Sequence, residues 1–239
     1  VAATLLHDVI EDAGESLSDL KSHFGKDTAR LVEGVTKISK VRLQGERRYV
    51  ESLRKVVVAM AKDIRVIMIK FSDRLHNLAT LQYVPEEKRK RIARESIEIH
   101  APIANRLGMM EMKAKLEDLA FPHLYPAEAE WVESLVAQQY ESKRALCDGL
   151  TNNIREIIAT HHLTHVLVSG RMKSRFSLYQ KLLRFERDIN QIYDLVALRV
   201  VCADIADCYT ILGLIHETWT PVRGRIKDYI TNPKSNGYQ

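Results

Sequence analysis

The sequence predicts a mainly α-helical N-terminal domain followed by the beginning of an α/β or α+β domain. Two observations support this division. Up to about residue 162, apolar residues recur at spacings of three and four, which is the period of an amphipathic helix. Beyond that point, two short apolar runs rich in β-branched residues alternate with helical patterns, an order typical of a sheet packed against helices.

The N-terminal pattern predicts five longer helices. Asp63 is a suitable N-cap for the third, and Pro85 suits the first turn of the fourth, where its missing N–H costs no hydrogen bond. Pro102 can kink the fourth helix, and a break is expected between Pro122 and Pro126. The predicted helices cover residues 16–24, 27–39, 63–81, 85–107 and 127–159.

The period changes in the last third of the chain. Residues 165–169 (HVLVS) predict a short strand, and residues 194–202 (DLVALRVVC) predict a buried strand that contains one arginine. Helices are predicted at 174–185 and 206–218. We expect these alternating elements to belong to a sheet that is incomplete within this chain.

Length and cysteine content exclude several classes of protein. No apolar run among the 239 residues approaches the ~18 that a membrane span needs. The three cysteines are odd in number and lack CxxC spacing, which excludes a disulfide framework and a cysteine zinc site and favours the cytoplasm. The chain begins at Val1 rather than Met, so we expect a segment of a longer protein. A leader that directs it to an organelle stroma stays open.

Basic charge is concentrated in the C-terminal third. The formal charge of the chain is +5. Residues 164–239 contain 11 Lys and Arg against 7 Asp and Glu, which leaves only +1 for the rest. A basic surplus of this kind favours a polyanionic partner, either a nucleic acid or a phosphorylated nucleotide.

Four residues of metal-ligand type lie close together near the start of the chain. On a helix, the spacings of three and four place His7, Asp8, Glu11 and Asp12 on one side. An imidazole beside a carboxylate can bind a cation, and acids one turn further can orient a water or accept a proton. The alternative interpretation is a solvated helical face with a stray histidine.

A second polar group interrupts the apolar helix predicted at 63–81. Asp73, Asn77 and Thr80 follow one another at spacings of four and three and form one stripe. A carboxylate that is half-buried in this way needs a partner, because an unpaired buried charge is costly. A metal ion shared with the N-terminal histidine and aspartate would supply one, whereas an interaction with the adjacent arginine or a capping role is the structural alternative.

The C-terminal third lacks a glycine-rich phosphate loop, since neither GxxxxGK[ST] nor GxGxxG occurs. Side chains must therefore supply the charge, and Arg171, Lys173, Ser177 and Lys181 lie where the first predicted strand gives way to a helix. The N-terminus of that helix favours an anion. An ordinary basic turn is the alternative.

Two further features suit nucleotide chemistry. Asp194 stands at the start of the second predicted strand, where an acid beside a basic pocket could hold Mg²⁺, although a turn-forming aspartate fits equally well. The final stretch, 224–239, combines two lysines and an arginine with two tyrosines, which suits base stacking and phosphate pairing. A basic loop without a ligand is the alternative.

The strings at these positions resemble those of one family. HDVIEDAG, FGKDTARLVEGVTKISK, DIRVIMIKFSDRLHNLATL and IHAPIANRLGM resemble the HD-type hydrolase domain of RelA/SpoT homologues, which make and destroy the alarmone (p)ppGpp. The resemblance implies a Mn²⁺-dependent hydrolase that removes the 3′-pyrophosphate. It implies metal ligation by His7, Asp8 and Asp73, handling of the attacking water by Glu11 and Asp12, and nucleotide contacts from Asn77 and Thr80.

The C-terminal strings resemble the nucleotidyltransferase-like synthetase domain of the same family. They are GRMKSRFSLYQK, YDLVALRVV, LGLIHETWTPVRGRIKDYI and NPKSNGYQ, in which RIKD fits the RxKD variant of bifunctional members. The synthetase transfers pyrophosphate from ATP to the 3′-hydroxyl of GDP or GTP. The resemblance implies ATP phosphates at Arg171, Lys173, Ser177 and Lys181, catalytic Mg²⁺ at Asp194, and guanine-nucleotide binding by Arg225, Lys227, Lys234, Asn236 and Tyr238.

The resemblance also implies an organisation. Residues 1–125 would belong to the hydrolase domain, 126–163 to connecting helices, and 164–239 to the synthetase domain. The family has a further metal-binding histidine before this segment and a catalytic glutamate after it, so we expect both sites to be incomplete here. Substrates and products would be ATP, GDP or GTP, and (p)ppGpp, with ribosome or other regulatory contacts made through regions outside the chain. The alternatives are a generic HD-type nucleotide phosphohydrolase and a catalytically inactive RNA-binding or scaffold protein.

Overall fold

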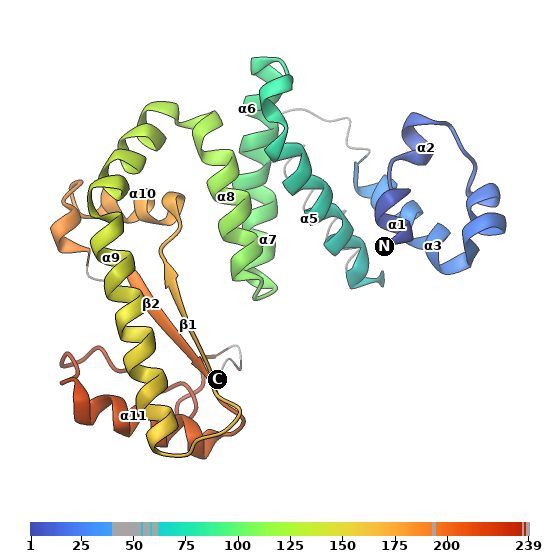
Figure 1. Cartoon of the computed structure of the whole chain (residues 1–239). Coiled ribbons are helices and arrows are strands. Elements are labelled where there is room, and N and C mark those ends of the chain that lie inside the picture. The colour runs from blue at the N-terminus through green and yellow to red at the C-terminus, as the bar shows by residue number, and fades with distance from the viewer. Residues whose placement is uncertain (40–53, 55–57, 59–61, 193–194, 236, 238–239) are drawn as a thin grey trace. The chain divides into compact units, whose positions relative to one another are not determined.

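The computed structural model describes residues 1–39, 54, 58, 62–192, 195–235 and 237 (Figure 1). The described chain is helical up to residue 160 and then adds a two-stranded sheet. It divides into two compact units. The N-terminal unit comprises residues 1–132 and 174–179, and the C-terminal unit comprises residues 133–173 and 180–239.

The N-terminal unit is built from helices. A 3₁₀ turn (Leu81–Tyr83) follows α5, and a π-helical turn (Ser96–His100) joins α6 to α7. The helices are α1 (Ala2–Leu5), α2 (Val9–Asp12), α3 (Leu17–Ser39), α5 (Ile64–Ala79), α6 (Glu86–Glu95), α7 (Ala101–Arg106) and α8 (Met110–Leu124).

Local chemistry explains most of these boundaries. The two helices predicted at 16–24 and 27–39 are confirmed as the two arms of α3, which meet at Gly25. The φ of Gly25 is 84°, a value that glycine adopts without steric cost. The Asp63 cap is confirmed as well, because its carboxylate accepts a hydrogen bond from the Arg65 N–H at 3.0 Å.

The prolines act differently from one another. The helix predicted at 85–107 is present as α6, the π turn and α7. The π turn lies just before Pro102, whose ring would collide with a carbonyl of the preceding regular turn. The break predicted between Pro122 and Pro126 is wrong at its start, since Pro122 lies inside α8. Near a helix end, proline removes few hydrogen bonds, and the Tyr125 N–H still donates to the Phe121 carbonyl.

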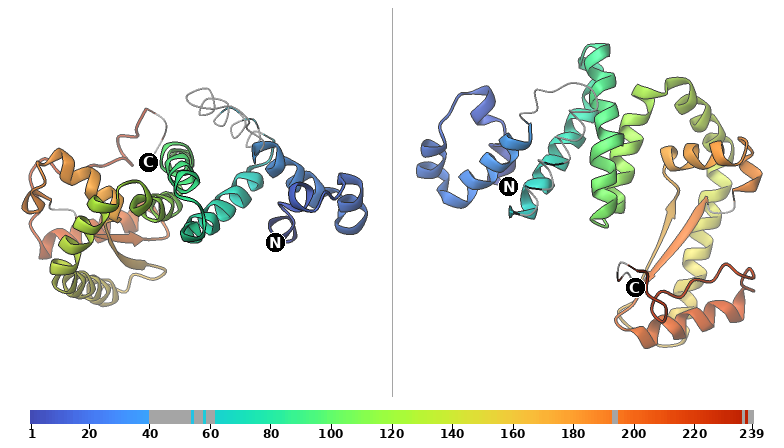
Figure 2. Two further views of the ribbon diagram at one scale, coloured as in Figure 1. Left: turned by 90° about the horizontal axis from the view of Figure 1, so that it is seen from above. Right: turned by 180° about the vertical axis from the view of Figure 1, so that it is seen from behind.

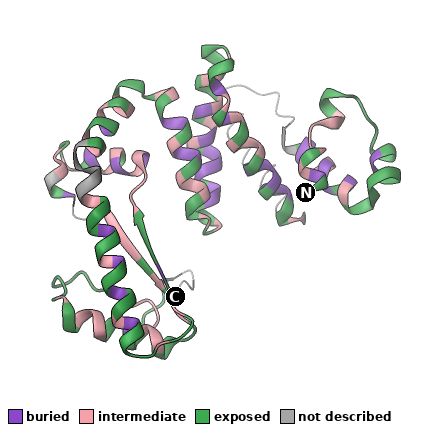
Figure 3. Ribbon diagram, viewed as in Figure 1, coloured by how far each residue is buried: buried purple, intermediate pink, exposed green. Residues whose placement is uncertain are grey.

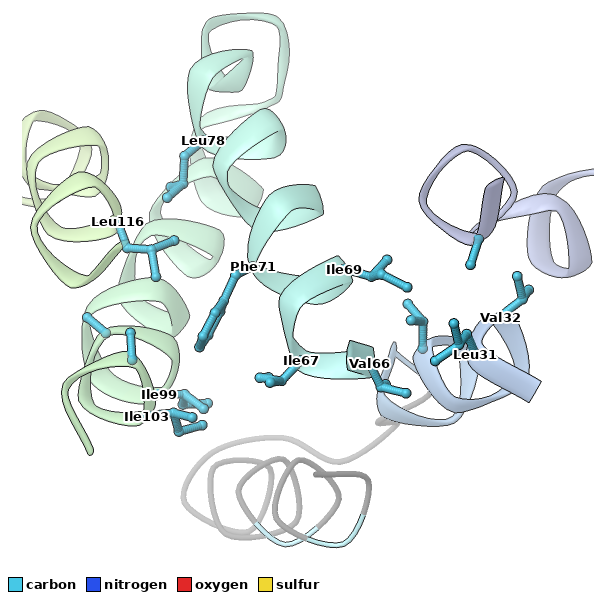
Figure 4. Close-up of a cluster of buried hydrophobic side chains, with 14 of the residues drawn as sticks. Leu31, Val32, Val66, Ile67, Ile69, Phe71, Leu78, Ile99, Ile103 and Leu116 are labelled. Atoms are coloured by element: carbon cyan, nitrogen blue, oxygen red, sulfur yellow. The ribbon is translucent and has the colours of Figure 1, made fainter. Parts of the chain in front are cut away.

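Packing around α5 forms the core of the N-terminal unit. Figure 4 shows Val66 and Ile69 of α5 facing α3, while Ile67 and Phe71 face the side chains of the π turn and α7. Buried residues accordingly lie along α5, α7 and α8 (Figure 3). Each fully buried side chain of this size contributes roughly 1.5–3 kcal/mol. This burial on two sides holds α5 in place, and with it Asp73.

The C-terminal unit places one long helix against an antiparallel strand pair. The views in Figure 2 show the sheet lying alongside α9 (Pro126–Thr160). In the register of the pair, Ser169 is opposite Arg199. The elements that follow α9 are β1 (Leu167–Met172), α10 (Arg175–Arg184), a 3₁₀ turn (Ile189–Gln191), β2 (Val196–Val201) and α11 (Ile205–Thr218).

Three of the four elements predicted after residue 164 agree with the structure within two residues, and the first strand is shifted. It runs from Leu167 to Met172 instead of covering 165–169. His165 has a φ of 59°, which a strand does not accommodate, and pairing with β2 extends β1 to Met172. The expected fold class, a helical domain followed by the start of an α/β domain, is confirmed.

Close approach of β1 to α9 shapes the core of the C-terminal unit. Val168 packs on Ile154 and Ile158 of α9. Two residues further, a Cβ on Gly170 would lie 2.4 Å from the Cys147 Sγ, so only glycine fits without a shift. Among the described residues, no helix is both long and apolar enough to cross a membrane.

Candidate functional site

His7 lies in the turn between α1 and α2, and its ring is held in one tautomer. Its Nδ1 is 2.8 Å from the carbonyl oxygen of Thr4. A carbonyl can only accept, so Nδ1 carries the proton and the lone pair of a neutral ring is on Nε2. Nε2 lies 3.0 Å from an Asp8 carboxylate oxygen and 3.4 Å from one of Asp73. It is buried and forms no hydrogen bond with any described residue.

This arrangement fits a divalent cation. A lone pair that faces two carboxylates is repulsive unless positive charge lies between them. The ligand atoms of His7, Asp8 and Asp73 all lie within 4.8 Å of one another. One imidazole nitrogen and two carboxylate oxygens form a set that first-row divalent metals accept. The three residues could therefore share one ion.

Asp73 is oriented by two neighbours on its own helix. The Lys70 Nζ lies 2.6 Å from its Oδ2, and the Asn77 amide donates to its Oδ1 at 2.7 Å. Burial tends to raise the pKa of Asp73, but the Lys70 ammonium, with contributions from His7 and Arg74, holds it below its usual value. The carboxylate is therefore ionised and available as a ligand.

Lys70 is the residue that sequence reasoning missed. The structure pairs Asp73 with Lys70, while the adjacent Arg74 lies 3.6 Å from Glu95. The side chains of Lys70 and Asp73 are only 10% and 8% exposed. The spacing of three residues was a usable signal for this pair. A lysine within an apolar helix is nevertheless easily read as a solvated position.

The remaining residues predicted for this site lie differently. Glu11 and Asp12 are exposed on α2, and their side chains form no hydrogen bond or ion pair with the described part of the chain. Thr80 ends α5, and its hydroxyl donates to the His76 carbonyl at 3.0 Å. It also donates to the Asn77 carbonyl at 3.3 Å. The structure thus joins His7 to both aspartates and, through Asp73, to Asn77 and Thr80, and leaves Glu11 and Asp12 outside that group.

The basic residues predicted to hold phosphates fall in both units. Arg171 is exposed on β1. The backbone N–H of Lys173, the residue that follows β1, donates to the Leu195 carbonyl at 2.9 Å. Lys181 lies on α10 with its Nζ 5.9 Å from the centre of the Phe185 ring. These residues belong to the C-terminal unit, whereas Ser177, which is 2.8 Å from Ser174 between hydroxyl oxygens, belongs to the N-terminal unit.

Asp228 organises the segment after α11. Its Oδ1 accepts from the N–H groups of Ile230 and Thr231, at 3.0 and 2.9 Å. Its Oδ2 accepts from the Tyr209 hydroxyl at 3.0 Å. Bonds from the Thr231 backbone and hydroxyl, followed by that of Tyr209, lower the pKa of Asp228. Sequence reasoning missed Tyr209, because nothing local marks a helical tyrosine that contacts a turn 19 residues later.

Cations flank this turn. Arg225 and Lys227 precede it and are exposed, while the Lys234 Nζ after it lies 4.5 Å from the centre of the Tyr229 ring. The segment therefore presents positive charge beside an aromatic ring. Three further predicted site residues lie outside the described part of the chain, namely Asp194, Asn236 and Tyr238.

Comparison with known proteins agrees with this division of the chain. A family model described as an HD domain matches residues 1–110. A second, described as a region found in RelA / SpoT proteins, matches residues 170–239. The first match contains His7, Asp8 and Asp73, and the second contains the basic residues of β1, of α10 and of the segment after α11.

Curated relatives match almost the whole chain. It is 46% identical over 237 residues to a GTP pyrophosphokinase of Streptomyces coelicolor. The matched region covers 99% of this chain and 28% of that protein. The chain is 40% identical over 238 residues to the bifunctional (p)ppGpp synthase/hydrolase SpoT of Escherichia coli, covering 99% and 34%. A guanosine-3′,5′-bis(diphosphate) 3′-pyrophosphohydrolase of Haemophilus influenzae is 39% identical over 240 residues, covering 100% and 35%. The chain thus spans about a third of the length of these relatives.

Proposed function

We propose, on the premise that this chain belongs to the family of RelA/SpoT proteins, that the protein containing it both hydrolyses and synthesises (p)ppGpp. The names of its relatives include each activity separately and the two together. The match to residues 170–239 also disfavours a generic HD phosphohydrolase. The hydrolase domain would occupy residues 1–125, connecting helices 126–163, and the start of the synthetase domain 164–239.

The hydrolase site would use one divalent ion, which we take to be Mn²⁺, held by His7, Asp8 and Asp73. The observation that supports this is the buried Nε2 of His7, which faces two carboxylate oxygens and has no hydrogen bond to a described residue. When bound, such an ion lowers the pKa of a water and polarises a phosphate. The match to an HD domain and the similarity to SpoT support metal-dependent catalysis at this site.

The chain's own groups prepare this site. The Thr4 carbonyl fixes the His7 ring, and Lys70 and Asn77 orient the Asp73 carboxylate. Glu11 and Asp12 lie on α2, three and four residues after Asp8. They are exposed, and would orient the attacking water and accept its proton.

The nucleotide would contact the end of α5. Asn77 donates to Asp73, while its amide oxygen makes no hydrogen bond with the described residues and would accept one from the substrate. Thr80 lies one turn further along the helix and would contact the same nucleotide.

The synthetase site would assemble from the basic segments. Arg171, Lys173, Ser177 and Lys181 would contact the ATP phosphates, and Asp194 would hold catalytic Mg²⁺. Phosphoryl transfer depends on positioning and charge neutralisation, which suits a region that carries most of the net charge of the chain. Guanine-nucleotide binding would fall to Arg225, Lys227, Lys234, Asn236 and Tyr238.

Location and partners follow from this assignment. We place the protein in the cytoplasm, which agrees with three cysteines that are all free thiols. ATP, GDP or GTP, and (p)ppGpp would be its substrates and products. Ribosome or other regulatory contacts would be made by parts of the protein outside this chain.

Metal binding tests the assignment directly. In a calorimetric titration of the chain with Mn²⁺, Asp73→Asn should weaken binding at least tenfold, on the order of the effect that metal-site substitutions have. The exposed Glu87→Gln, also in the N-terminal unit, is the control and should bind as the parent does. In the full-length protein, Asp73→Asn should abolish release of pyrophosphate from ppGpp. Unchanged Mn²⁺ affinity, or persistent hydrolysis, would contradict the ligand set.

A further inference from the structure

Two of the three cysteines lie side by side at the corner between β2 and α11. Cys202 directly follows β2, and Cys208 lies in the first turn of α11. Their Sγ atoms are 3.1 Å apart, and both are half-buried free thiols. Since a disulfide bond is about 2.05 Å long, the two sulfurs need to approach by only about 1 Å.

We propose that Cys202 and Cys208 form a reversible disulfide, and that the oxidant which this site takes is a low-molecular-weight disulfide. The nucleotide sites described above do not use either thiol. The proposal concerns a modification site separate from those sites and does not depend on the proposed function.

The exchange proceeds in two balanced steps. The thiolate of Cys208 attacks one sulfur of the small disulfide, which forms a mixed disulfide and releases one small thiolate. The Cys202 thiol then loses its proton and attacks the Cys208 sulfur, which forms the intrachain bond and releases the second small thiolate. Both cysteines are oxidised, and the small disulfide is reduced to two thiols.

The surroundings determine which thiol begins the reaction. Burial, the Cys208 thiol and the nearby Asp207 raise the pKa of Cys202 to about 11. Cys202 is therefore a poor initial nucleophile, which leaves the attack to Cys208. Because the Cys202 thiolate forms only rarely at neutral pH, oxidation should be slow there and faster in mildly alkaline solution.

The bond would close the corner between β2 and α11, whose residues cap α11 and reach the turn at Asp228. Asp204 caps α11 by accepting a hydrogen bond from the Asp207 N–H at 2.9 Å. Tyr209, directly after Cys208, donates to Asp228 in the turn that the basic residues flank. A disulfide would therefore restrain the corner from which Tyr209 reaches Asp228.

The third cysteine serves as an internal reference. Cys147 is 5% exposed and packs against β1 at Gly170. It lies on α9, and the disulfide proposed here leaves it as a thiol. The chain should therefore pass from three free thiols to one on oxidation.

Thiol counting tests the proposal. The reduced native chain is treated with excess oxidised glutathione in mildly alkaline buffer and then alkylated in denaturant. We expect three alkyl groups before oxidation, one after it, and three again after dithiothreitol. Before alkylation, the mass should fall by about 2 Da, the two hydrogens lost. Three alkyl groups after oxidation, or a retained glutathione adduct, would overturn the proposal.

Peptide mapping then locates the bond. An aspartate-specific protease cleaves before Asp204 and Asp207 and separates the two cysteines, so their peptides should stay joined until a reductant is added. After oxidation, Cys208→Ser should keep two thiols, because Cys202 is the poor initial nucleophile. Cys202→Ser should keep one thiol and carry glutathione on Cys208, since no second thiol resolves the mixed disulfide. Cys147→Ser should lose both of its remaining thiols. A bond to Cys147, or one between two chains, would refute the assignment even if one of the variants failed to fold.

Discussion

Replacing Lys70 by methionine probes the arrangement around Asp73, and the chain provides a matched control. Lys70–Asp73 and Lys90–Glu86 both have Nζ–O distances of 2.6 Å. Side-chain exposures are 10% and 8% in the first pair and 53% and 72% in the second. Breaking a buried pair costs about 3–5 kcal/mol, because one charge is left uncompensated. An exposed pair four residues apart contributes only about 0.3–0.5 kcal/mol.

We expect Lys70→Met to lower the free energy of unfolding by about 3 kcal/mol, the lower end of that range, because Asn77 still donates to Asp73. Lys90→Met should lower it by less than about 1 kcal/mol. Denaturant unfolding followed by far-ultraviolet circular dichroism measures both variants.

Mn²⁺ should stabilise Lys70→Met more than the parent chain, since the ion replaces the lost cation and no longer meets the ammonium. Both chains are compared at one Mn²⁺ concentration. At about 100 times the dissociation constant of the parent chain, binding stabilises the parent by about 2.7 kcal/mol. The unfolding curves are compared with Mn²⁺ and with a chelator. Equal losses in the two lysine variants, or a Mn²⁺ response no larger than that of the parent, would refute the reasoning.

Two further predictions concern the C-terminal unit. Gly170→Ala should destabilise the chain by about 1–3 kcal/mol in the same unfolding assay, because the new Cβ meets the Cys147 Sγ at 2.4 Å. Gly149→Ala, on α9 with open space around it, is its control and should stabilise by about 0.5–1 kcal/mol; a similar loss in both would contradict the packing argument. The turn at Asp228 should loosen in acid. Its pKa is lowered in the folded chain, so the stabilisation is complete above the ordinary value of 3.8 and is lost as the pH falls below it through the folded value. Amide hydrogen exchange of Thr231 should accelerate over that range relative to its intrinsic rate, and exchange that stays equally protected at low pH would exclude this role.

Local signals were sufficient for much of the fold. The Asp63 cap, the break between the arms of α3 and the extent of α9 depend on neighbouring residues and on a helical period that continues over many turns. The cluster of His7, Asp8 and Asp73 could be anticipated from its unusual ligand types. The expectation of one helix that carries His7 and Asp8 together with Glu11 and Asp12 is wrong, because the first two lie in the turn before α2.

Features that depend on distant partners could not be predicted in the same way. The ends of β1 follow from its pairing with β2 and from the left-handed φ of His165. The contact between Cys202 and Cys208 depends on how the corner before α11 folds. The pairing of Lys70 with Asp73 matters for stability because both side chains are buried, and the local sequence does not show that burial.

The most direct test of the account asks whether His7 binds the metal through nitrogen. Pulsed electron paramagnetic resonance of Mn²⁺ bound to the chain should show coupling to one imidazole nitrogen. The coupling should disappear in His7→Asn and persist in His76→Asn, which changes an exposed histidine of the same unit. Bound Mn²⁺ with oxygen ligands only, or a nitrogen coupling that survives His7→Asn, would contradict the proposed metal centre.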